Sequence, residues 1–227
     1  MEEYNESVDY KRKSKKKGVT AKVLHRIEDN LMKYNIEVIF YNLGEINMSH
    51  CTGCQLCYKT GDCFMDDDAE RLSKIISEVD GVVLGSPTYA SNVSGMMKDF
   101  IDRGHFVIEQ LLHDKYCMTV ATGENYGNKN TLKVLNELVI FSGGRLTGNI
   151  LVKTSFNDIE NNIRKMNMRI EKLSKSLITG IKYKRIYIFQ KLFHFIIFRF
   201  GIKPFVEKKG SSYLGVIKKW RESGVLN

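Results

Sequence analysis

Short apolar runs alternate with helical patterns along this chain, and that alternation restricts its fold more than any other feature. Residues 81–85, 116–121 and 150–152 are short and largely apolar, as strands buried in a sheet should be. Residues 36–43 form a further compact run of β-branched and aromatic side chains. Strands separated by helices form a parallel sheet that is covered on both faces. We therefore expect an α/β protein with a doubly wound parallel sheet.

The segments between these runs have apolar residues at helical spacing. The expected faces are Val23, Leu24, Ile27 and Leu31; Leu72, Ile75, Ile76 and Val79; Met96, Met97, Phe100, Ile101, Ile108, Leu111 and Leu112; Leu132, Leu135, Leu138 and Val139; and Ile159, Ile163, Met166, Ile170, Leu173 and Leu177. An acidic trio at 66–68 precedes the second face, and Ser94 is a suitable cap for the third.

The amino-terminal residues do not supply the strand that should precede the first helix. Residues 1–10, MEEYNESVDY, alternate acidic and polar side chains that cannot line a sheet interior. Either the first strand is degenerate or missing, or this N-terminus differs from that of functional relatives. For a chain of 227 residues we expect a polar segment at 1–13, one sheet domain at 14–180 and a C-terminal arm at 181–227.

Positive charge is concentrated in two segments. The formal net charge is +9, but residues 11–17 and residues 181–206 each carry six basic residues and no acid, which leaves a slightly acidic remainder. Both segments can be solvated surface. Alternatively, residues 11–17 form an anion-binding loop and residues 181–206 contact an anionic surface. No uncharged stretch reaches the roughly 18 residues of a membrane span, and the N-terminus is unlike a signal peptide. We therefore expect a cytoplasmic protein.

Four of the five cysteines are close together in the sequence. They follow the pattern C-x2-C-x2-C-x5-C at Cys51, Cys54, Cys57 and Cys63. Such a set can bind a [4Fe–4S] cluster, in which each iron takes one thiolate. Thiols without a metal, a zinc site and a disulfide are the alternatives. Cys117 falls within an expected strand, and we interpret it as a buried structural thiol.

Three loops have the composition of a cofactor site. In open α/β sheets, ligands bind at the carboxyl ends of the strands. The loop at 85–95 offers small residues and Tyr89 as a flat surface for stacking, and the loop at 122–127 again combines glycines with an aromatic residue. Residues 14–20, SKKKGVT, bring hydroxyls, lysines and backbone N–H groups to the start of the first helix, where a phosphate binds well.

These residues resemble the flavodoxin-like NAD(P)H-dependent FMN reductases, and in particular the iron–sulfur flavoproteins. The resemblance covers residues 14–155. Its most specific parts are the four-cysteine motif with the acidic run after it and the segment GVVLGSPTYASNVSGMMKDFIDR at 81–103. The chain departs from the family at Lys15, where the phosphate loop usually has proline, and at Val19, where it has asparagine.

The resemblance implies an FMN at the carboxyl edge of the sheet and a [4Fe–4S] cluster at the four cysteines. It assigns the FMN phosphate to Ser14, Lys16, Gly18 and Thr20, the isoalloxazine loop to Pro87, Thr88, Tyr89, Ser94 and Gly95, and the third loop to Thr122, Gly123 and Gly127. It also implies a homodimer or homotetramer, NAD(P)H or another electron donor, and a small-molecule or protein redox partner.

The resulting expectation is an electron-transfer flavoprotein. Because the cofactors supply the chemistry, we expect no catalytic acid–base residue, and none of the five histidines lies in a recognisable triad. The alternative is a flavin-free, degenerate relative that acts as an iron–sulfur carrier or partner-binding protein. Residues 181–206, with eight aromatic and six basic residues, are either a subunit-contact arm or a peripheral membrane contact. Nucleic-acid binding by this arm is a third reading, which we do not expect.

Overall fold

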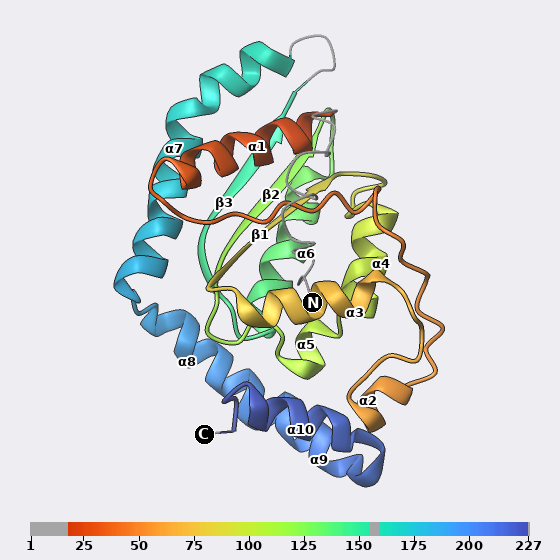
Figure 1. Ribbon diagram of the computed structural model, residues 1–227. Coiled ribbons are helices and arrows are strands. Elements are labelled where there is room, and N and C mark those ends of the chain that lie inside the picture. The colour runs from red at the N-terminus through yellow and green to blue at the C-terminus, as the bar shows by residue number, and fades with distance from the viewer. Residues whose placement is uncertain (1–17, 155–158, 227) are drawn as a thin grey trace, which may run out of the picture.

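A parallel sheet lies at the centre of the computed structural model, which describes residues 18–154 and 159–226 (Figure 1). Within these residues the sheet has three strands in the order β1 (Gly81–Pro87), β2 (Tyr116–Gly123) and β3 (Arg145–Lys153), and each adjacent pair is parallel. The central strand β2 is buried from Tyr116 to Thr122. The apolar runs at 81–85, 116–121 and 150–152 are thus confirmed as strands.

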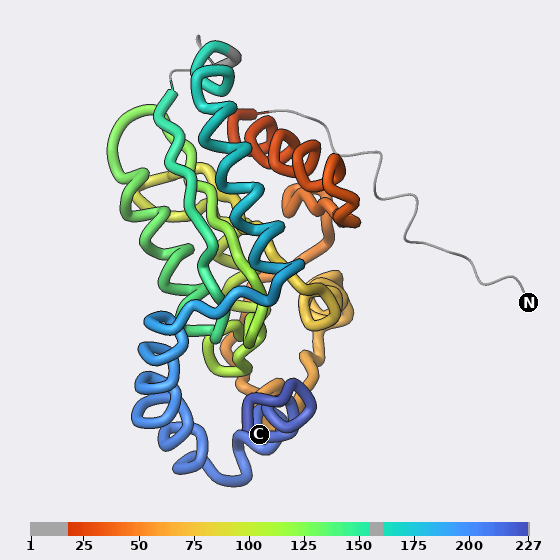
Figure 2. Tube along the Cα trace, turned by 90° about the vertical axis from the view of Figure 1, so that its left-hand side faces the viewer, coloured from red at the N-terminus to blue at the C-terminus, as the bar shows by residue number. Residues whose placement is uncertain are grey.

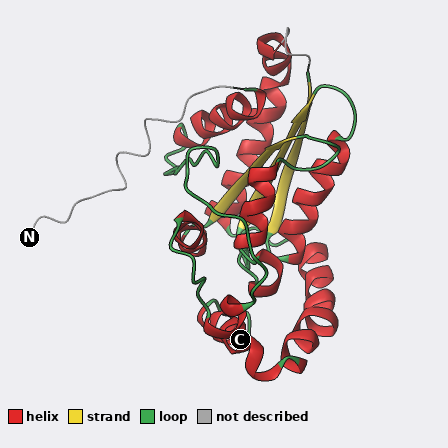
Figure 3. Ribbon diagram, turned by 90° about the vertical axis from the view of Figure 1, so that its right-hand side faces the viewer, coloured by secondary structure: helices red, strands yellow, loops and turns green. Residues whose placement is uncertain are grey.

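Helices cover both faces of this sheet (Figure 3). On one face, α1 (Val19–Met32) and α7 (Ile159–Tyr183) bury their apolar residues against β2 and β3. On the other face, α3 (Asp68–Glu78), α4 (Gly95–Arg103), α5 (Phe106–Glu109) and α6 (Asn128–Phe141) form a second core cluster with β1 and β2. The predicted α/β, doubly wound arrangement is therefore confirmed.

Residues 36–43 are not a strand. The structure assigns no strand to them, and Ile36 and Val38 pack on one core cluster while Tyr41 and Leu43 pack on the other. A strand needs a hydrogen-bonded neighbour, and no described strand lies between this segment and β1. The sequence also leaves in doubt the strand that should precede the first helix. That position, at residues 1–10, lies outside the described residues.

The expected helix at 96–112 is divided into two. α4 ends at Arg103, and α5 begins only at Phe106, because His105 adopts a left-handed conformation at φ 46°. Gln110 at the end of α5 is also left-handed, at φ 57°. The apolar spacing continues across this break, so the sequence pattern did not reveal it. The turn directs the chain below the sheet.

The residues after α7 form a helical extension. It contains α8 (Ile188–Ile197), the π-helix η4 (Phe198–Ile202), α9 (Lys203–Lys208), the 3-10 helix η5 (Gly210–Tyr213) and α10 (Leu214–Glu222). A third core cluster joins its side chains to Tyr58 and Ile108, with Trp220 and Val216 fully buried. Each fully buried large apolar side chain contributes roughly 1.5–3 kcal/mol, so the extension packs firmly against the segment that carries the cysteines.

The extension lies at the end of the domain opposite the carboxyl ends of the strands (Figures 1 and 2). It shares that end with α2 (Leu56–Thr60). No helix in the described ranges 18–154 and 159–226 is both long and apolar enough to cross a membrane.

Candidate functional site

The cysteine segment folds as a loop around the short helix α2. Three residues with positive φ turn the backbone: Gly53 at 69°, Gln55 at 62° and Gly61 at 100°. As a result, the four cysteines of the motif line one pocket together with Arg103 and His105. No disulfide forms, since all five cysteines of the chain are free. Cys117 lies apart in β2, where burial raises the pKa of its thiol to about 12, as a structural thiol requires.

Three N–H groups face the sulfur atoms of this pocket. The backbone N–H of Gly53 donates to Cys51 Sγ at 3.4 Å, and Arg103 Nη2 donates to Cys63 Sγ at 3.4 Å. His105 Nε2 lies 3.2 Å from Cys57 Sγ. Two of these three groups belong to side chains that can carry positive charge. The pocket is therefore built to stabilise negative charge on sulfur.

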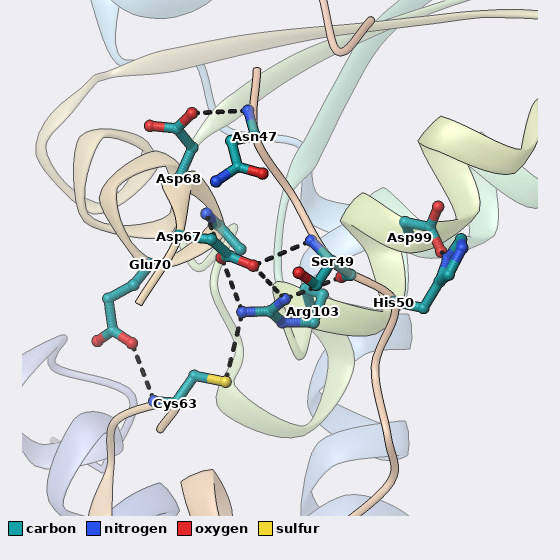
Figure 4. A network of polar contacts seen from close by, with 10 residues as sticks. Asn47, Ser49, His50, Cys63, Asp67, Asp68, Glu70, Asp99 and Arg103 are labelled. Carbon is teal, nitrogen blue, oxygen red and sulfur yellow. Dashed lines mark hydrogen bonds and ion pairs between the residues drawn. The ribbon is translucent and has the colours of Figure 1, made fainter. Parts of the chain in front are cut away.

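Arg103 is held rigidly at the end of α4 (Figure 4). Its guanidinium donates to both oxygens of Asp67 at 2.7 and 2.8 Å and to the carbonyl of Ser49 at 2.8 Å. Asp67 also caps α3 by accepting from the N–H of Ala69, and it accepts from the N–H of Ser49. Burial opposes ionisation of Asp67, but these hydrogen bonds outweigh it and lower its pKa. Both side chains are thus charged and fixed beside Cys63.

His105 is connected to the C-terminal extension through Glu109. Its Nδ1 lies 3.2 Å from Glu109 Oε1, and the other carboxylate oxygen accepts from Lys219 Nζ at 2.7 Å. Burial lowers the pKa of His105, but the contacts with Cys57 and Glu109 prevail and raise it to about 10. At neutral pH the imidazole is therefore protonated and can donate to the sulfur of Cys57.

The extension also touches the cysteine loop directly. A Cβ on Gly215 of α10 would clash with the backbone nitrogen of Gly61, so these two segments meet backbone to backbone. Trp220 Nε1 donates to the carbonyl of Ile108 at 2.9 Å. α10 is thus part of the wall around the cysteine pocket.

A single metal ion and a cluster make different demands on the four cysteines. Within the described residues, no three His, Cys, Asp or Glu side chains gather as ligands of one metal ion. A cubane cluster does not need its ligands to converge on one ion, because each thiolate binds its own iron. Four thiolates around such a cluster carry net negative charge, which Arg103 and His105 in the same pocket would offset.

The second candidate site lies at the carboxyl edge of the sheet, where three predicted loops meet. Thr20 at the start of α1 and Thr122 at the end of β2 share a hydrogen bond of 2.6 Å between their hydroxyls. The N–H of Thr88 donates to the carbonyl of Thr122 at 2.7 Å. A Cβ on Gly127 would lie 2.5 Å from Cα of Ser91, so the second and third loops are in close contact.

This edge retains groups suited to a planar, phosphorylated cofactor. The hydroxyl of Thr88 is buried and has no hydrogen-bond partner within the described part of the chain. Gly18 precedes α1 at φ 85° without a side-chain cap, which leaves the first N–H groups of the helix for an anion. A Cβ on Gly95 would meet no atom within 4 Å. The Tyr89 ring is 63% exposed and available for stacking.

The other predicted flavin residues have different surroundings. Pro87 ends β1. The hydroxyl of Ser94 accepts from the N–H of Met97 and so caps α4 as the sequence suggested. Gly123 packs closely against Asn128, whose side-chain N–H donates to the Gly123 carbonyl at 3.1 Å. Ser14 and Lys16 lie outside the described residues. The binding roles of the whole set stay predictions.

Sequence reasoning did not identify Arg103 and His105, which line the cysteine pocket, or Glu109 and Lys219, which line the hollow beside it. One signal was available for Arg103, since it continues the buried stripe of α4 after Met97 and Phe100, where a charged side chain needs a partner. No comparable signal marks Lys219, which is more than a hundred positions from Glu109.

Comparisons with known proteins agree on one family. Residues 13–155 match the family described as NADPH-dependent FMN reductase. An iron–sulfur flavoprotein of Clostridioides difficile (strain 630) is 36% identical over 217 residues, which cover 93% of this chain and 96% of that protein. An iron–sulfur flavoprotein of Archaeoglobus fulgidus is 36% identical over 89 residues, covering 39% of this chain and 40% of the relative.

Solved structures show the same fold at low sequence identity. A structure described as flavone reductase has a TM-score of 0.58 at 15% identity, covering 73% of this chain and 59% of that one. The azoreductase of Bacillus anthracis has a TM-score of 0.52 at 14% identity, covering 74% of this chain and 95% of its own. The predicted flavodoxin-like fold is confirmed.

Proposed function

The chain belongs to the NADPH-dependent FMN reductase family, as a flavoprotein oxidoreductase, and we propose that it is an iron–sulfur flavoprotein carrying both FMN and a [4Fe–4S] cluster. The observation that carries the proposal is the pocket in which four cysteines meet Arg103 and His105. The Clostridioides difficile relative, named an iron–sulfur flavoprotein, matches nearly the whole chain and supports the same conclusion.

FMN supplies the ability to accept a pair of electrons and release them singly, and the cluster accepts one electron at a time. The protein supplies the binding groups. The N–H groups at the start of α1 would hold the phosphate, the Thr88 hydroxyl would find its missing partner on the flavin, and Tyr89 would stack on the ring. Cys51, Cys54, Cys57 and Cys63 would bind the four irons.

Helix α4 connects the two sites within one chain. Its cap, Ser94, lies in the flavin loop, and its last residue, Arg103, contacts the cysteine pocket. Nine residues of helix span about 13 Å at 1.5 Å per residue. We propose NAD(P)H as the electron donor, a small-molecule or protein acceptor, and a homodimer or homotetramer as the working unit.

Anaerobic purification with iron, sulfide and flavin analysis tests the proposal. We expect about four irons and one FMN per chain, and each of the four substitutions Cys51→Ser, Cys54→Ser, Cys57→Ser and Cys63→Ser should lower the iron content. Cys117→Ser is the matched control, because Cys117 is buried in β2 away from the pocket and its loss should leave iron unchanged.

The visible spectrum separates this proposal from the alternative. Flavin bands together with a broad iron–sulfur shoulder support the iron–sulfur flavoprotein. A shoulder without flavin would instead support a flavin-free cluster carrier. A colourless protein that stays colourless after reconstitution would contradict both.

A further inference from the structure

Helix α8 presents an exposed apolar ridge. Phe189, Phe193 and Ile196 of α8 and Phe200 of the adjoining η4 recur at spacings of four, three and four residues, which places them on one side of the helical run. Their exposed fractions are 88%, 51%, 48% and 73%. Leu192, at 55% exposed, widens the ridge. Large aromatic side chains concentrated in this way on a surface mark a contact site.

The opposite side of α8 is fastened to the domain, so the ridge cannot turn inward. Gln190 bonds both the N–H and the carbonyl of Leu146 in β3, at 2.8 and 2.9 Å. His194 Nε2 lies 2.6 Å from Gln110 Oε1. Phe198, which follows α8, is buried against Trp220. The direction of the ridge is thus set by contacts on the other face of the helix.

The surroundings of the ridge are positively charged. Residues 181–206 contain six basic residues and no acid. Among them, Lys191 on α8 and Arg199 on η4 are exposed. Lys184 forms an ion pair with Asp80 at 2.7 Å, but both side chains are about two-thirds exposed, which makes that pair weak.

This charge decides between two occupants. A symmetric contact with a second copy would place the same patch on both sides, so that cations would face cations. An anionic lipid surface complements both features, because apolar side chains enter the boundary of the acyl chains while lysine and arginine contact the headgroups. No described helix is both long and apolar enough to cross a bilayer, whereas α8 can lie in the plane of one.

We propose that α8 and the adjoining η4 form a peripheral membrane-binding helix that inserts the ridge of Phe189, Phe193, Ile196 and Phe200 into an anionic bilayer surface. Phe205 of α9 and Leu214 of α10 in the same helical extension are also exposed, at 45% and 56%. The proposal does not depend on either cofactor.

Co-sedimentation of the full chain with vesicles tests this inference. The vesicles are phosphatidylcholine alone or phosphatidylcholine with one third phosphatidylglycerol. We expect binding to the anionic vesicles that weakens with added salt, and at least tenfold weaker binding to phosphatidylcholine alone. Phe189→Ser/Phe200→Ser and Lys191→Gln/Arg199→Gln should each weaken binding to the anionic vesicles at least tenfold.

The matched control is Met168→Ser/Lys172→Gln, which removes an exposed apolar and an exposed basic side chain from α7. It should bind like the parent protein. Circular dichroism establishes that each variant is folded, and the ridge positions were chosen as the two most exposed so that folding is not at stake. Absence of sedimentation with anionic vesicles, or equal loss in the control, would overturn the proposal. So would an oligomer in solution that Phe189→Ser/Phe200→Ser dissociates while vesicle binding is absent, because the ridge would then be a contact between copies.

Discussion

Replacing Arg103 by methionine should cost about 3–5 kcal/mol of unfolding free energy, the range for breaking a buried ion pair on one side. The side chains of Arg103 and Asp67 are only 1% and 3% exposed. Methionine preserves much of the apolar stem but removes both hydrogen bonds to the carboxylate and the one to Ser49. The Asp67 carboxylate then stays buried with only backbone N–H partners. Since domains are stable by about 5–15 kcal/mol, the loss is readily measured.

Urea unfolding of the reduced apoprotein at pH 7 measures this effect, and the same helix supplies the control. Lys98 pairs with Asp102 on the exposed side of α4, where the side chains are 57% and 41% exposed. Lys98→Met should cost less than about 1 kcal/mol. A loss for Arg103→Met as small as that of the control would refute the reasoning.

The pH dependence gives a second check on the same pair. The pKa of Asp67 is lowered in the folded state, so the unfolded chain binds more protons in the acid range and stability falls with falling pH. The contribution of the pair is present above the ordinary carboxyl pKa of about 4 and is lost as the pH drops through the lower, folded value. The difference between the parent protein and Arg103→Met should therefore shrink in acid, and a difference that is constant with pH would contradict the ionic origin.

Three further outcomes test other parts of the structure. Gly215→Ala should lower the free energy of unfolding by about 1–3 kcal/mol and reduce iron retention, because its Cβ would clash with the Gly61 backbone. Gly201→Ala is the control and should do neither, since its added Cβ meets no atom within 4 Å. Urea unfolding and iron analysis measure the two effects. Thr88→Val should weaken FMN binding about tenfold, which is the effect of losing one hydrogen bond. It should not destabilise the apoprotein, because the Thr88 hydroxyl has no partner among the described residues. Fluorescence titration of FMN measures the change in affinity. Burial lowers the pKa of His194 to about 4, so between about pH 6.5 and 4 the unfolded chain binds one more proton than the folded protein. The free energy of unfolding should therefore fall as the pH decreases through that window. His194→Gln should make this pH dependence less steep in urea unfolding measured at a series of pH values.

The strands could be predicted because burial on both faces leaves a simple trace in the sequence. β1 and β2 are short apolar runs, and their position between amphipathic helices determines their parallel pairing. Residues 36–43 have a strand-like composition but do not form a strand. Strand propensity describes a side chain's fit to a sheet, but a strand exists only with a neighbour. The expected neighbour falls on residues 1–10, whose composition is wrong for it.

The grouping of the four cysteines in one pocket was predictable, and the groups around them were not. Cys51 to Cys63 span thirteen positions, so their spacing alone indicates a common site. The cations beside them come from a distance, because Arg103 is forty positions from Cys63 and His105 forty-eight from Cys57. His105 reaches Cys57 through the left-handed turn after α4, and apolar spacing carries no information about such a turn.

We expect helix α4 to make the proposed flavin loop and the cysteine pocket mechanically dependent on each other. Ser94 fixes its first turn within the loop after β1, and the Arg103–Asp67 pair fixes its last turn to α3 and the cysteine segment. A nine-residue helix with buried Met97 and Phe100 moves as a rigid unit. A change at Arg103 that shifts this helix should therefore alter flavin affinity as well as iron retention. A change at Lys98, on the exposed face of the same helix, should alter neither, and that contrast distinguishes coupling through α4 from general loss of stability.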